Sequence, residues 1–342
     1  MRYEPPQAED RAIWDIWLSM YRLPAMAVAD ELGVFAALEA GPATAGETAR
    51  RLGFNERATA VLFSLLSALG LIVSRGGRHE LADVARIYLL PHSPYYWGPL
   101  LRTLGVLPQQ RAALIRALQS ADEVPALSSD RLPSRAWERG QIDWAQAESV
   151  TRIMHCHSLP ASVGVARSGQ LAGIRRLLDI GGGSGCFSIA LAQHFPEIQC
   201  TVMELPAVCE VARSYIEEGG VSDRVSTVAA DMFHDAWPCG YDGVFFSNIF
   251  HDWSAETNLL LARRAYDALP GGGRIVLHEM LLDEDGSGPM TTASFSVLMM
   301  LGTQGRQYTF SDLRQILTTA GFADIHATAS YGYYSMVIGR KP

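Results

Sequence analysis

The sequence has 342 residues, of which 48% are hydrophobic and 19% charged, and a formal net charge of −8. This balance indicates a folded protein of one or two domains, and the acidic surface disfavours nucleic acid as a partner. The five cysteines form no CxxC pair, which disfavours a disulfide framework or a structural zinc site. Because neither a secretory leader nor a long apolar run is present, we expect a cytoplasmic protein that does not enter a membrane.

Residues 1–100 are predicted to form a mainly helical region that ends in a short hairpin. Thr44 or Thr48 is suited to cap a short helix that Gly53 closes, and a second helix is predicted at 55–69. The segments LIVS and HELA, on either side of a Gly-Gly turn, are typical of two short strands. Helix, helix and hairpin in this order indicate a winged helix.

The second helix of this pattern is unsuited to DNA. Its sequence, NERATAVLFSLLSALG, carries charge only at Glu56 and Arg57, and residues 1–100 hold 9 arginines against 11 acidic residues. Phosphate contacts need clustered positive charge, so we expect no nucleic-acid partner. A helix that is apolar nearly all round more often packs against another chain, and we therefore expect a homodimer.

From residue 177 onward the chain alternates between short apolar segments and amphipathic helices. The segments LLDIG, CTVME, VSTVA, GVFFS and RIVLHEM are predicted to be strands, with helices at about 185–195, 206–218 and 255–268 between them. This alternation predicts an α/β, Rossmann-like sheet that is mostly parallel, with helices on both faces. After a helix at about 310–320, ADIHATA and YYSMVIG are close enough to pair as an antiparallel edge.

The segment LLDIGGGSG places Gly181, Gly183 and Gly185 directly after the first of these strands and before a helix. Glycine here permits a tight turn and lets a ligand approach the backbone without a Cβ in between. A dinucleotide fingerprint needs G-x-G-x-x-G, whereas the next two residues are Cys186 and Phe187, so the third glycine comes one residue early. The loop therefore predicts a ligand site but weakens the dinucleotide interpretation.

Three acidic residues stand at the ends of three successive strands. Asp179 precedes the glycine loop, where a carboxylate suits the amino group of an amino-acid-like ligand, and Glu204 ends the second strand, where an acid accepts from both ribose hydroxyls. Asp231 ends the third strand and suits an exocyclic adenine amine, with Met232 and Phe233 lining the ring. An amine, a ribose and an adenine without a phosphate describe S-adenosylmethionine, whose product is S-adenosylhomocysteine.

The motifs DIGGGSG, ELP, DMF, FHDW, LPGGGRIVLHEMLL and GRQYTFSDLRQILTTAGF cover nearly the whole chain. In these motifs the sequence resembles the small-molecule O-methyltransferases typified by plant caffeate-type and bacterial natural-product tailoring enzymes. The resemblance implies a class I methyltransferase sheet of seven strands whose last pair is reversed, and an N-terminal winged-helix domain that forms an intertwined dimer. It also implies that Leu205 lies at the cofactor, as do Ser247, where plant members carry a lysine, and Asn248.

FHDW places His251 just past the fourth strand, at the ligand-binding edge of a parallel sheet. Methyl transfer is a direct displacement that needs alignment and a deprotonated nucleophile, and a histidine suits the removal of a hydroxyl proton. The resemblance implies that two acids orient this histidine. Glu279 matches one of them, whereas Gln307 replaces the other. A neutral amide orients an imidazole but cannot stabilise an imidazolium, a task for which Asp252 could compensate.

The resemblance further implies that the segment MHCHSLPAS is a helix that lines the acceptor pocket. It carries Met154, His155 and His157. Two histidines two residues apart on a helix point about 200° from each other, so they cannot both bind one metal. In one alternative, one of them faces the pocket and the other lies at the surface or in packing. In the other, His155 or His157 joins His251 around a metal that chelates a keto acid. Outside this second alternative we predict no metal.

In FSVLMML, Phe295 and Met299 share one helical face. Their place in the family implies that they line the acceptor pocket, where flexible methionines suit a flat aromatic ring. The sequence therefore predicts a methyltransferase that acts on a small aromatic hydroxyl acceptor in secondary metabolism. The alternatives are metal-assisted C-methylation of an α-keto acid and a non-catalytic winged-helix regulator that binds the cofactor as a signal.

The remaining residues, 95–170, are predicted to be mostly helical, with breaks that include Pro108 and the region of Gly164. The predicted domains are a winged-helix-like dimerisation domain at 1–100, a helical linker that contributes to the acceptor pocket at 101–170, and a cofactor-binding catalytic domain at 171–342.

Overall fold

The computed structural model describes residues 22–54, 69–101, 142–284 and 303–342, together with single positions in the ranges 16–67 and 289–299. The chain forms two compact units, Met1–Leu107 and Pro108–Pro342. The predicted limits at residues 100 and 170 stay predictions, and residues 102–141 lie outside the described part. Among the described helices, none is both long and apolar enough to cross a membrane.

The first unit is built from short helices and one β-hairpin. Its elements are α2 (Arg22–Glu31), α3 (Val34–Glu39), α4 (Ala45–Leu52), β1 (Ile72–Arg75), β2 (Arg78–Leu81), α6 (Asp83–Tyr88) and α7 (Gly98–Leu101). Helix α4 begins with a capping box, in which Thr44 and Glu47 each accept a hydrogen bond from the backbone of the other, and it ends at Gly53. Strands β1 and β2 pair antiparallel, as predicted for LIVS and HELA. The helix predicted at 55–69 lies mostly outside the described residues, so the winged helix stays a prediction.

The second unit contains a seven-stranded sheet with the strand order β5-β4-β3-β6-β7-β9-β8. Its strands are β3 (Arg176–Ile180), β4 (Gln199–Glu204), β5 (Val225–Ala229), β6 (Gly243–Ser247), β7 (Arg274–Met280), β8 (Ala323–Tyr331) and β9 (Tyr334–Arg340). Strands β3 to β7 pair in parallel, whereas β9 inserts between β7 and β8 and runs antiparallel to both. The predicted mostly parallel sheet with an antiparallel ending is confirmed.

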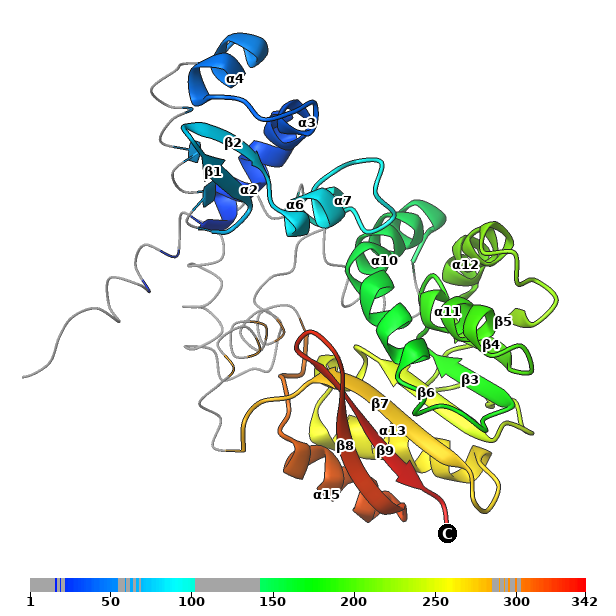
Figure 1. Ribbon diagram of the computed structural model, residues 1–342. Coiled ribbons are helices and arrows are strands. Elements are labelled where there is room, and N and C mark those ends of the chain that lie inside the picture. The colour runs from blue at the N-terminus through cyan, green and yellow to red at the C-terminus, as the bar shows by residue number, and fades with distance from the viewer. Residues whose placement is uncertain are drawn as a thin grey trace, which may run out of the picture. The chain divides into compact units, whose positions relative to one another are not determined.

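Helices cover both faces of this sheet (Figure 1). On one face pack α10 (Trp144–Arg167), α11 (Cys186–His194) and α12 (Pro206–Glu218), and on the other α13 (Ala255–Ala268) and α15 (Phe310–Ala320). Each face has its own apolar core. Neighbouring residues of a strand point to opposite faces, so Phe245 belongs to the core under α11 and Phe246 to the core under α13.

Helix α10 continues through the predicted break near Gly164. Both Pro160 and Gly164 lie inside the helix, which ends at Arg167. A Cβ at Gly164 would lie 2.7 Å from Cβ of Tyr331, so glycine here permits the close approach of strand β8. The low helix propensity of glycine favours a break, but this tertiary contact outweighs it.

Strands β3 and β6 are neighbours in the middle of the sheet, yet the chain leaves them toward opposite faces. After β3 it enters α11, and after β6 it forms a short 3-10 helix, η1 (Phe250–Asp252), before α13. In open sheets of this kind the ligand crevice forms where the connections diverge, at the carboxyl ends of the two strands. This edge holds both the glycine loop and the FHDW segment.

Candidate active site

The loop after β3 forms an open cradle. Gly181, Gly183 and Gly185 adopt positive φ angles of 65°, 55° and 74°, a conformation that other residues rarely adopt. A Cβ at Gly181 would lie 2.5 Å from Cδ1 of Ile249, whereas no atom stands within 4 Å of a Cβ at Gly183. The main chain is therefore closely packed at Gly181 and open to a ligand at Gly183.

Asp179 lies beneath this loop. Its side chain accepts a 2.7 Å hydrogen bond from Oγ of Ser188 on α11, and a Cβ at Gly182 would lie 2.7 Å from its carboxyl carbon. Burial raises the pKa of Asp179 to about 6, because a carboxylate loses its hydration in the core. Asp179 therefore supports the loop from below, and a cationic amine next to it would stabilise its charged form.

Glu204, at the end of β4, binds the same loop from the side. Its Oε1 accepts from the N–H of Gly183 at 3.2 Å and its Oε2 from the N–H of Leu205 at 2.9 Å. Burial raises the pKa of Glu204 to about 7. Each carboxylate oxygen has a second lone pair with which to accept from a diol.

Asp231, just after β5, turns its carboxylate onto its own loop. Oδ1 accepts from the N–H of Phe233 at 2.7 Å, and Oδ2 lies 2.9 Å from Nδ1 of His234. Partial burial opposes the charge, but the bonds from His234 and Phe233 prevail and lower the pKa of Asp231. Met232 and Phe233 are half-buried beside it, and Phe233 packs edge-on against Trp253. Asp231 therefore also stabilises its own turn, and its role at an adenine amine stays a prediction.

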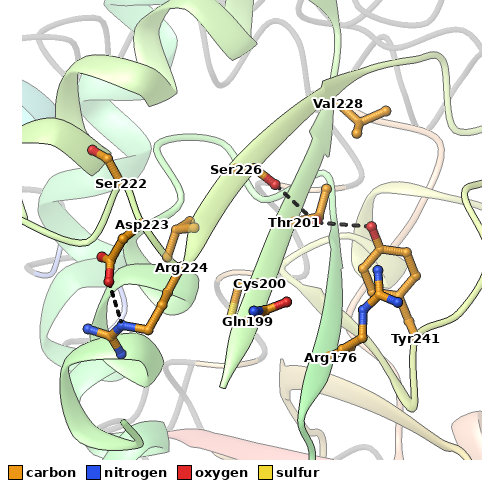
Figure 2. Close-up of a pocket in the computed structure, with 11 residues that line it drawn as sticks. Arg176, Gln199, Cys200, Thr201, Ser222, Asp223, Arg224, Ser226, Val228 and Tyr241 are labelled. Carbon is orange, nitrogen blue, oxygen red and sulfur yellow. Dashed lines mark hydrogen bonds and ion pairs between the residues drawn. The ribbon is translucent and has the colours of Figure 1, made fainter. Parts of the chain in front are cut away.

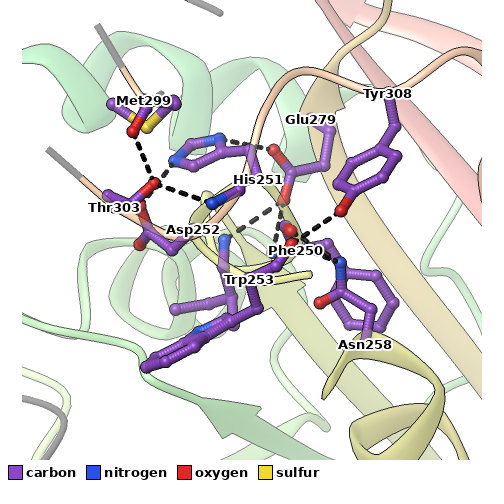
Figure 3. A network of polar contacts seen from close by, with 11 residues as sticks. Phe250, His251, Asp252, Trp253, Asn258, Glu279, Met299, Thr303 and Tyr308 are labelled. Carbon is purple, nitrogen blue, oxygen red and sulfur yellow. Dashed lines mark hydrogen bonds and ion pairs between the residues drawn. The ribbon is translucent and has the colours of Figure 1, made fainter. Parts of the chain in front are cut away.

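His251 lies at the centre of a hydrogen-bonded network (Figure 3). Its Nδ1 is 2.8 Å from Oε2 of Glu279, and the two residues are only 4% and 2% exposed. Its Nε2 lies 3.7 Å from Oδ1 of Asp252, too far for a direct hydrogen bond. Burial opposes the charged ring, but the carboxylates of Glu279 and Asp252 outweigh it and raise the pKa of His251 to about 9. With Nδ1 held by Glu279, Nε2 is the nitrogen that can exchange a proton with a ligand.

The backbone of residues 249–253 is held from several directions. Oε1 of Glu279 accepts from two N–H groups of this segment, at 3.1 and 2.9 Å. Nδ2 of Asn258 donates to one of its carbonyls at 2.7 Å, and Oη of Tyr308 donates to another at 2.6 Å. A Cβ at Gly305 would overlap the backbone of the segment. These contacts restrict the imidazole to one orientation.

Of the residues expected to orient His251, Glu279 contacts Nδ1 and Asp252 faces Nε2. Gln307 is fully buried in the chain that follows Gly305, which packs on the His251 segment. Burial raises the pKa of Asp252 to about 6, against the opposing effect of the His251 ring.

The two histidines of α10 have different surroundings. Nδ1 of His155 lies 2.8 Å from Oγ of Ser184 in the glycine loop, and its ring stacks on Tyr215 with the centroids 4.3 Å apart. Burial lowers the pKa of both His155 and His157 to about 4, and the charge of His251 contributes at His157. His155 therefore braces the glycine loop, whereas His157 lies within electrostatic range of His251.

Phe295 packs against the ring of His251, with the centroids 5.2 Å apart and the planes at 68°. Met299 follows one turn later, and its carbonyl accepts from Oγ1 of Thr303 at 2.8 Å (Figure 3). Met154, in contrast, is 38% exposed. Within the described part of the chain, no group of three or more His, Cys, Asp or Glu side chains is arranged to hold a metal ion.

Ser247, the last residue of β6, and Asn248, which follows it, lie beside a histidine that the sequence does not mark as functional. Oγ of Ser247 lies 2.9 Å from Nδ1 of His278, and the N–H of Asn248 donates to the carbonyl of His278 at 3.1 Å. His278 belongs to RIVLHEM, which the apolar pattern predicts only as a strand. The signal that marks it is a polar residue at a position that strand alternation assigns to the core.

A separate cavity of about 300 Å³ lies at the other end of the strands (Figure 2). Arg176 and Gln199, the first residues of β3 and β4, line it together with Thr201 and Tyr241. The Tyr241 hydroxyl donates to Oγ1 of Thr201 at 3.0 Å, and the Arg176 guanidinium lies over the tyrosine ring. Because parallel sheets bind ligands at their carboxyl edge, we assign this cavity no part in the candidate site.

Comparison with protein families matches both units of the chain. A model of the O-methyltransferase domain matches residues 132–323, which is more than half of the chain. A model of the O-methyltransferase dimerisation domain matches residues 14–91.

Individual proteins align over most of the length. The 3-hydroxy-5-methyl-1-naphthoate 3-O-methyltransferase of Streptomyces sahachiroi is 35% identical over 96% of this chain and 94% of its own. The L-tyrosine C(3)-methyltransferase of Streptomyces lavendulae is 31% identical over 85% of this chain and 81% of its own. Among solved structures, PigF with SAH matches with a TM-score of 0.77 and 26% identity, covering 98% of this chain and 100% of that one.

Proposed function

The chain belongs to the O-methyltransferase family, and on that premise we propose that it methylates a hydroxyl group of a small aromatic acceptor with His251 as the general base. The observation that carries the proposal is the buried pair of His251 and Glu279, 2.8 Å apart, at the carboxyl edge of the sheet. The same edge holds the glycine loop, so a methyl donor bound there would lie next to the base.

S-adenosylmethionine is the methyl donor. The residues present fit it, because the main chain is open at Gly183, Glu204 can accept from the ribose diol, and Asp179 offers a negative charge to the amine. When bound, its sulfonium supplies a methyl carbon that is open to direct displacement, and S-adenosylhomocysteine leaves.

His251 acts from its neutral form. With its Nδ1–H donating to Glu279, its Nε2 takes the hydroxyl proton as the oxygen–carbon bond forms, and Glu279 stabilises the resulting imidazolium. Since the pKa of His251 is raised to about 9, the neutral fraction and the rate increase with pH up to that value. A base of this strength is well matched to a phenol, whose ordinary pKa is about 10.

Two further observations support an aromatic acceptor. The Phe295 ring packs against the His251 ring at a steep angle, which places an aromatic ring beside the base. Met299, one turn away, offers a flexible and polarisable surface for a flat ring. The relative from Streptomyces sahachiroi, by its name, methylates a hydroxyl group on a naphthoate.

The relative named L-tyrosine C(3)-methyltransferase favours a second candidate, methylation of an aromatic carbon. The same base would serve, because removal of a phenolic proton increases the electron density on the ring carbon beside the oxygen. Metal-assisted methylation of an α-keto acid stays a prediction.

We also propose that the protein acts as a homodimer, since the dimerisation-domain match spans residues 14–91 of the first unit. The cytoplasmic location expected from the sequence stays a prediction.

The test is the release of S-adenosylhomocysteine by purified protein with a panel of phenols and a panel of α-keto acids, each with and without a chelator. We expect turnover of a phenol that ignores the chelator and that falls about 10²–10⁴-fold in His251→Ala. His326→Ala, on an exposed part of β8, is the matched control and should retain full activity. Full turnover by His251→Ala would reject the base, and turnover of a keto acid that the chelator abolishes would favour the metal route. NMR of the product separates O- from C-methylation.

A further inference from the structure

Strand β7 carries a second buried histidine, His278, which the proposed methyl transfer does not use. Its side chain is 0% exposed and points to the face of the sheet under α11, opposite to Glu279. The ring stacks on Tyr334 with the centroids 4.7 Å apart and the planes at 8°. A buried imidazole in an apolar core needs hydrogen-bond partners for both nitrogens.

His278 finds both partners in serine hydroxyls. Its Nδ1 lies 2.9 Å from Oγ of Ser247 at the end of β6, and its Nε2 lies 3.0 Å from Oγ of Ser330 on β8. Oγ of Ser330 in turn donates to the backbone carbonyl of Tyr334 at 3.1 Å. The three bonds form a hydrogen-bonded chain that runs from the ligand edge of β6 to the β8–β9 hairpin.

The last bond of this hydrogen-bonded chain determines which group donates in each of the others. A carbonyl oxygen only accepts, so the single proton of Ser330 goes to Tyr334, and Ser330 must accept from Nε2–H of His278. Burial lowers the pKa of His278 to about 3, so the ring is neutral and its Nδ1 carries no proton. The hydroxyl proton of Ser247 is therefore the one that fills the bond to Nδ1.

With its proton committed to His278, Ser247 presents only lone pairs to the ligand edge, where it is half-buried. It lies two residues beyond Phe245, the residue of β6 that pairs with Asp179 of β3, and so on the same face of the sheet as Asp179. Both groups accept hydrogen bonds, and neither attracts a carboxylate.

We infer that His278 is a positioning residue that holds Ser247 as a hydrogen-bond acceptor, and that Ser247 binds the α-ammonium group of the cofactor rather than its carboxylate. This rests on the proposed function, because it requires S-adenosylmethionine at this edge of the sheet. The resemblance implies a lysine at this place in plant members, which would attract the carboxylate. This chain would instead recognise the α-ammonium group of the same amino-acid moiety.

The tautomer of His278 is directly measurable. Nitrogen NMR of protein labelled with ¹⁵N-histidine, with the signals assigned by their loss in His278→Gln, should show a neutral ring protonated at Nε2 at neutral pH. A ring protonated at Nδ1, or a charged ring, would overturn the inference. This readout needs neither cofactor nor acceptor.

Binding measured by calorimetry tests the recognised group with three probes. S-adenosylhomocysteine has both charged groups, decarboxylated S-adenosylhomocysteine keeps only the ammonium, and deaminated S-adenosylhomocysteine keeps only the carboxylate. In Ser247→Ala we expect about tenfold weaker binding of the first two and no change for the third, because a hydrogen bond to a charged group is lost. A loss confined to the probes that keep the carboxylate, or an equal loss for all three, would overturn the inference.

His278→Phe keeps the ring on Tyr334 and removes both hydrogen bonds, so Ser247 can turn its proton outward. We expect the same selective loss of about tenfold, with a raised KM for S-adenosylmethionine and an unchanged kcat at saturation. His326→Ala should bind all three probes as the wild type does. If the wild-type protein binds none of the probes, the proposed cofactor itself is rejected. If the wild type binds them and Ser247→Ala binds them equally well, only the role of Ser247 and His278 is rejected.

Discussion

The two faces of strand β7 hold two buried histidine environments with opposite electrostatics. On one face Glu279 meets His251, and the pKa of that histidine rises to about 9. On the other face His278 meets two serine hydroxyls, and its pKa falls to about 3. Burial disfavours the charged ring in both cases, so the sign of the shift depends on whether the partner carries a charge.

The difference separates two tasks within one strand. The carboxylate of Glu279 stabilises the charged ring of His251, so this buried histidine can gain and lose a proton as a general base must. Hydroxyl partners keep His278 neutral and give its hydrogen bonds a fixed direction, as a positioning residue needs. Adjacent residues of one strand can serve both because alternation keeps them on separate faces.

The largest expected effect comes from Glu279→Gln, which gives His251 a neutral partner like those of His278. We expect kcat to fall about 10²–10⁴-fold, because the amide no longer stabilises the imidazolium that forms during transfer. The pH at which the rate reaches its plateau should move below 9, since the charge that raises the pKa of His251 is gone. Rate–pH profiles of the variant and the wild type check both.

Glu284→Gln is the matched control for this substitution. Glu284 is an exposed acid of the chain just after β7, and its carboxylate accepts from the N–H of Ser311 without contacting a histidine. It should leave the profile unchanged. A Glu279→Gln variant that keeps the wild-type plateau would show that the charge of Glu279 does not set the base.

An intermediate effect is expected on stability in alkaline solution. The pKa of His251 is raised from 6.5 to about 9, so the folded state holds this proton more tightly than the unfolded chain does. The contribution is complete below pH 6.5 and is lost as the pH rises through about 9, on the order of 3 kcal/mol in all. Urea unfolding at several pH values should show this loss in the wild type and not in His251→Gln. Equal pH dependence in both proteins would contradict it.

A smaller effect on stability is expected in acid solution, and it comes from His278 on the other face of β7. The pKa of His278 is lowered from 6.5 to about 3, so the folded state resists a proton that the unfolded chain accepts. Its stabilising contribution is present above pH 6.5 and is lost as the pH falls, by about 2 kcal/mol between pH 6.5 and about 5. His278→Phe should lose less stability than the wild type over this interval. His155 and His157 titrate in both proteins, so the difference reports His278 alone.

The sequence predicts the sheet well, because the parallel strands β3 to β7 are short, mostly apolar segments bounded by turn residues. The glycine loop and its neighbouring acids follow from spacing, since Asp179 and Glu204 lie at the ends of β3 and β4 and Asp231 closely follows β5. The direction in which each carboxylate points does not follow. That of Asp231 depends on His234 and on one N–H of its own turn, contacts that no spacing rule distinguishes from a ligand site.

Long-range partners were beyond the reach of local patterns. His155 meets Ser184 of the glycine loop, 29 positions away. His278 meets Ser330, 52 positions away, across an inserted strand. Such pairs depend on the register of the assembled sheet. The proximity of Glu279 to His251 could be anticipated only through the family resemblance, and the catalytic roles of both stay predictions.

The position of β9 between β7 and β8 affects how the protein folds while it is being synthesised. Strand β7 leaves the ribosome well before residues 334–340, so a growing chain has β7 paired with β6 on one side and open on the other. An open edge invites pairing with other chains, and a slip of one residue by β9 against β7 would turn Tyr334, which stacks on His278, to the other face of the sheet. A nascent chain that stalls before Tyr334 therefore carries all the groups of the methyl-transfer site without the strand that covers the edge of β7, and we expect it to depend on chaperones and to be inactive.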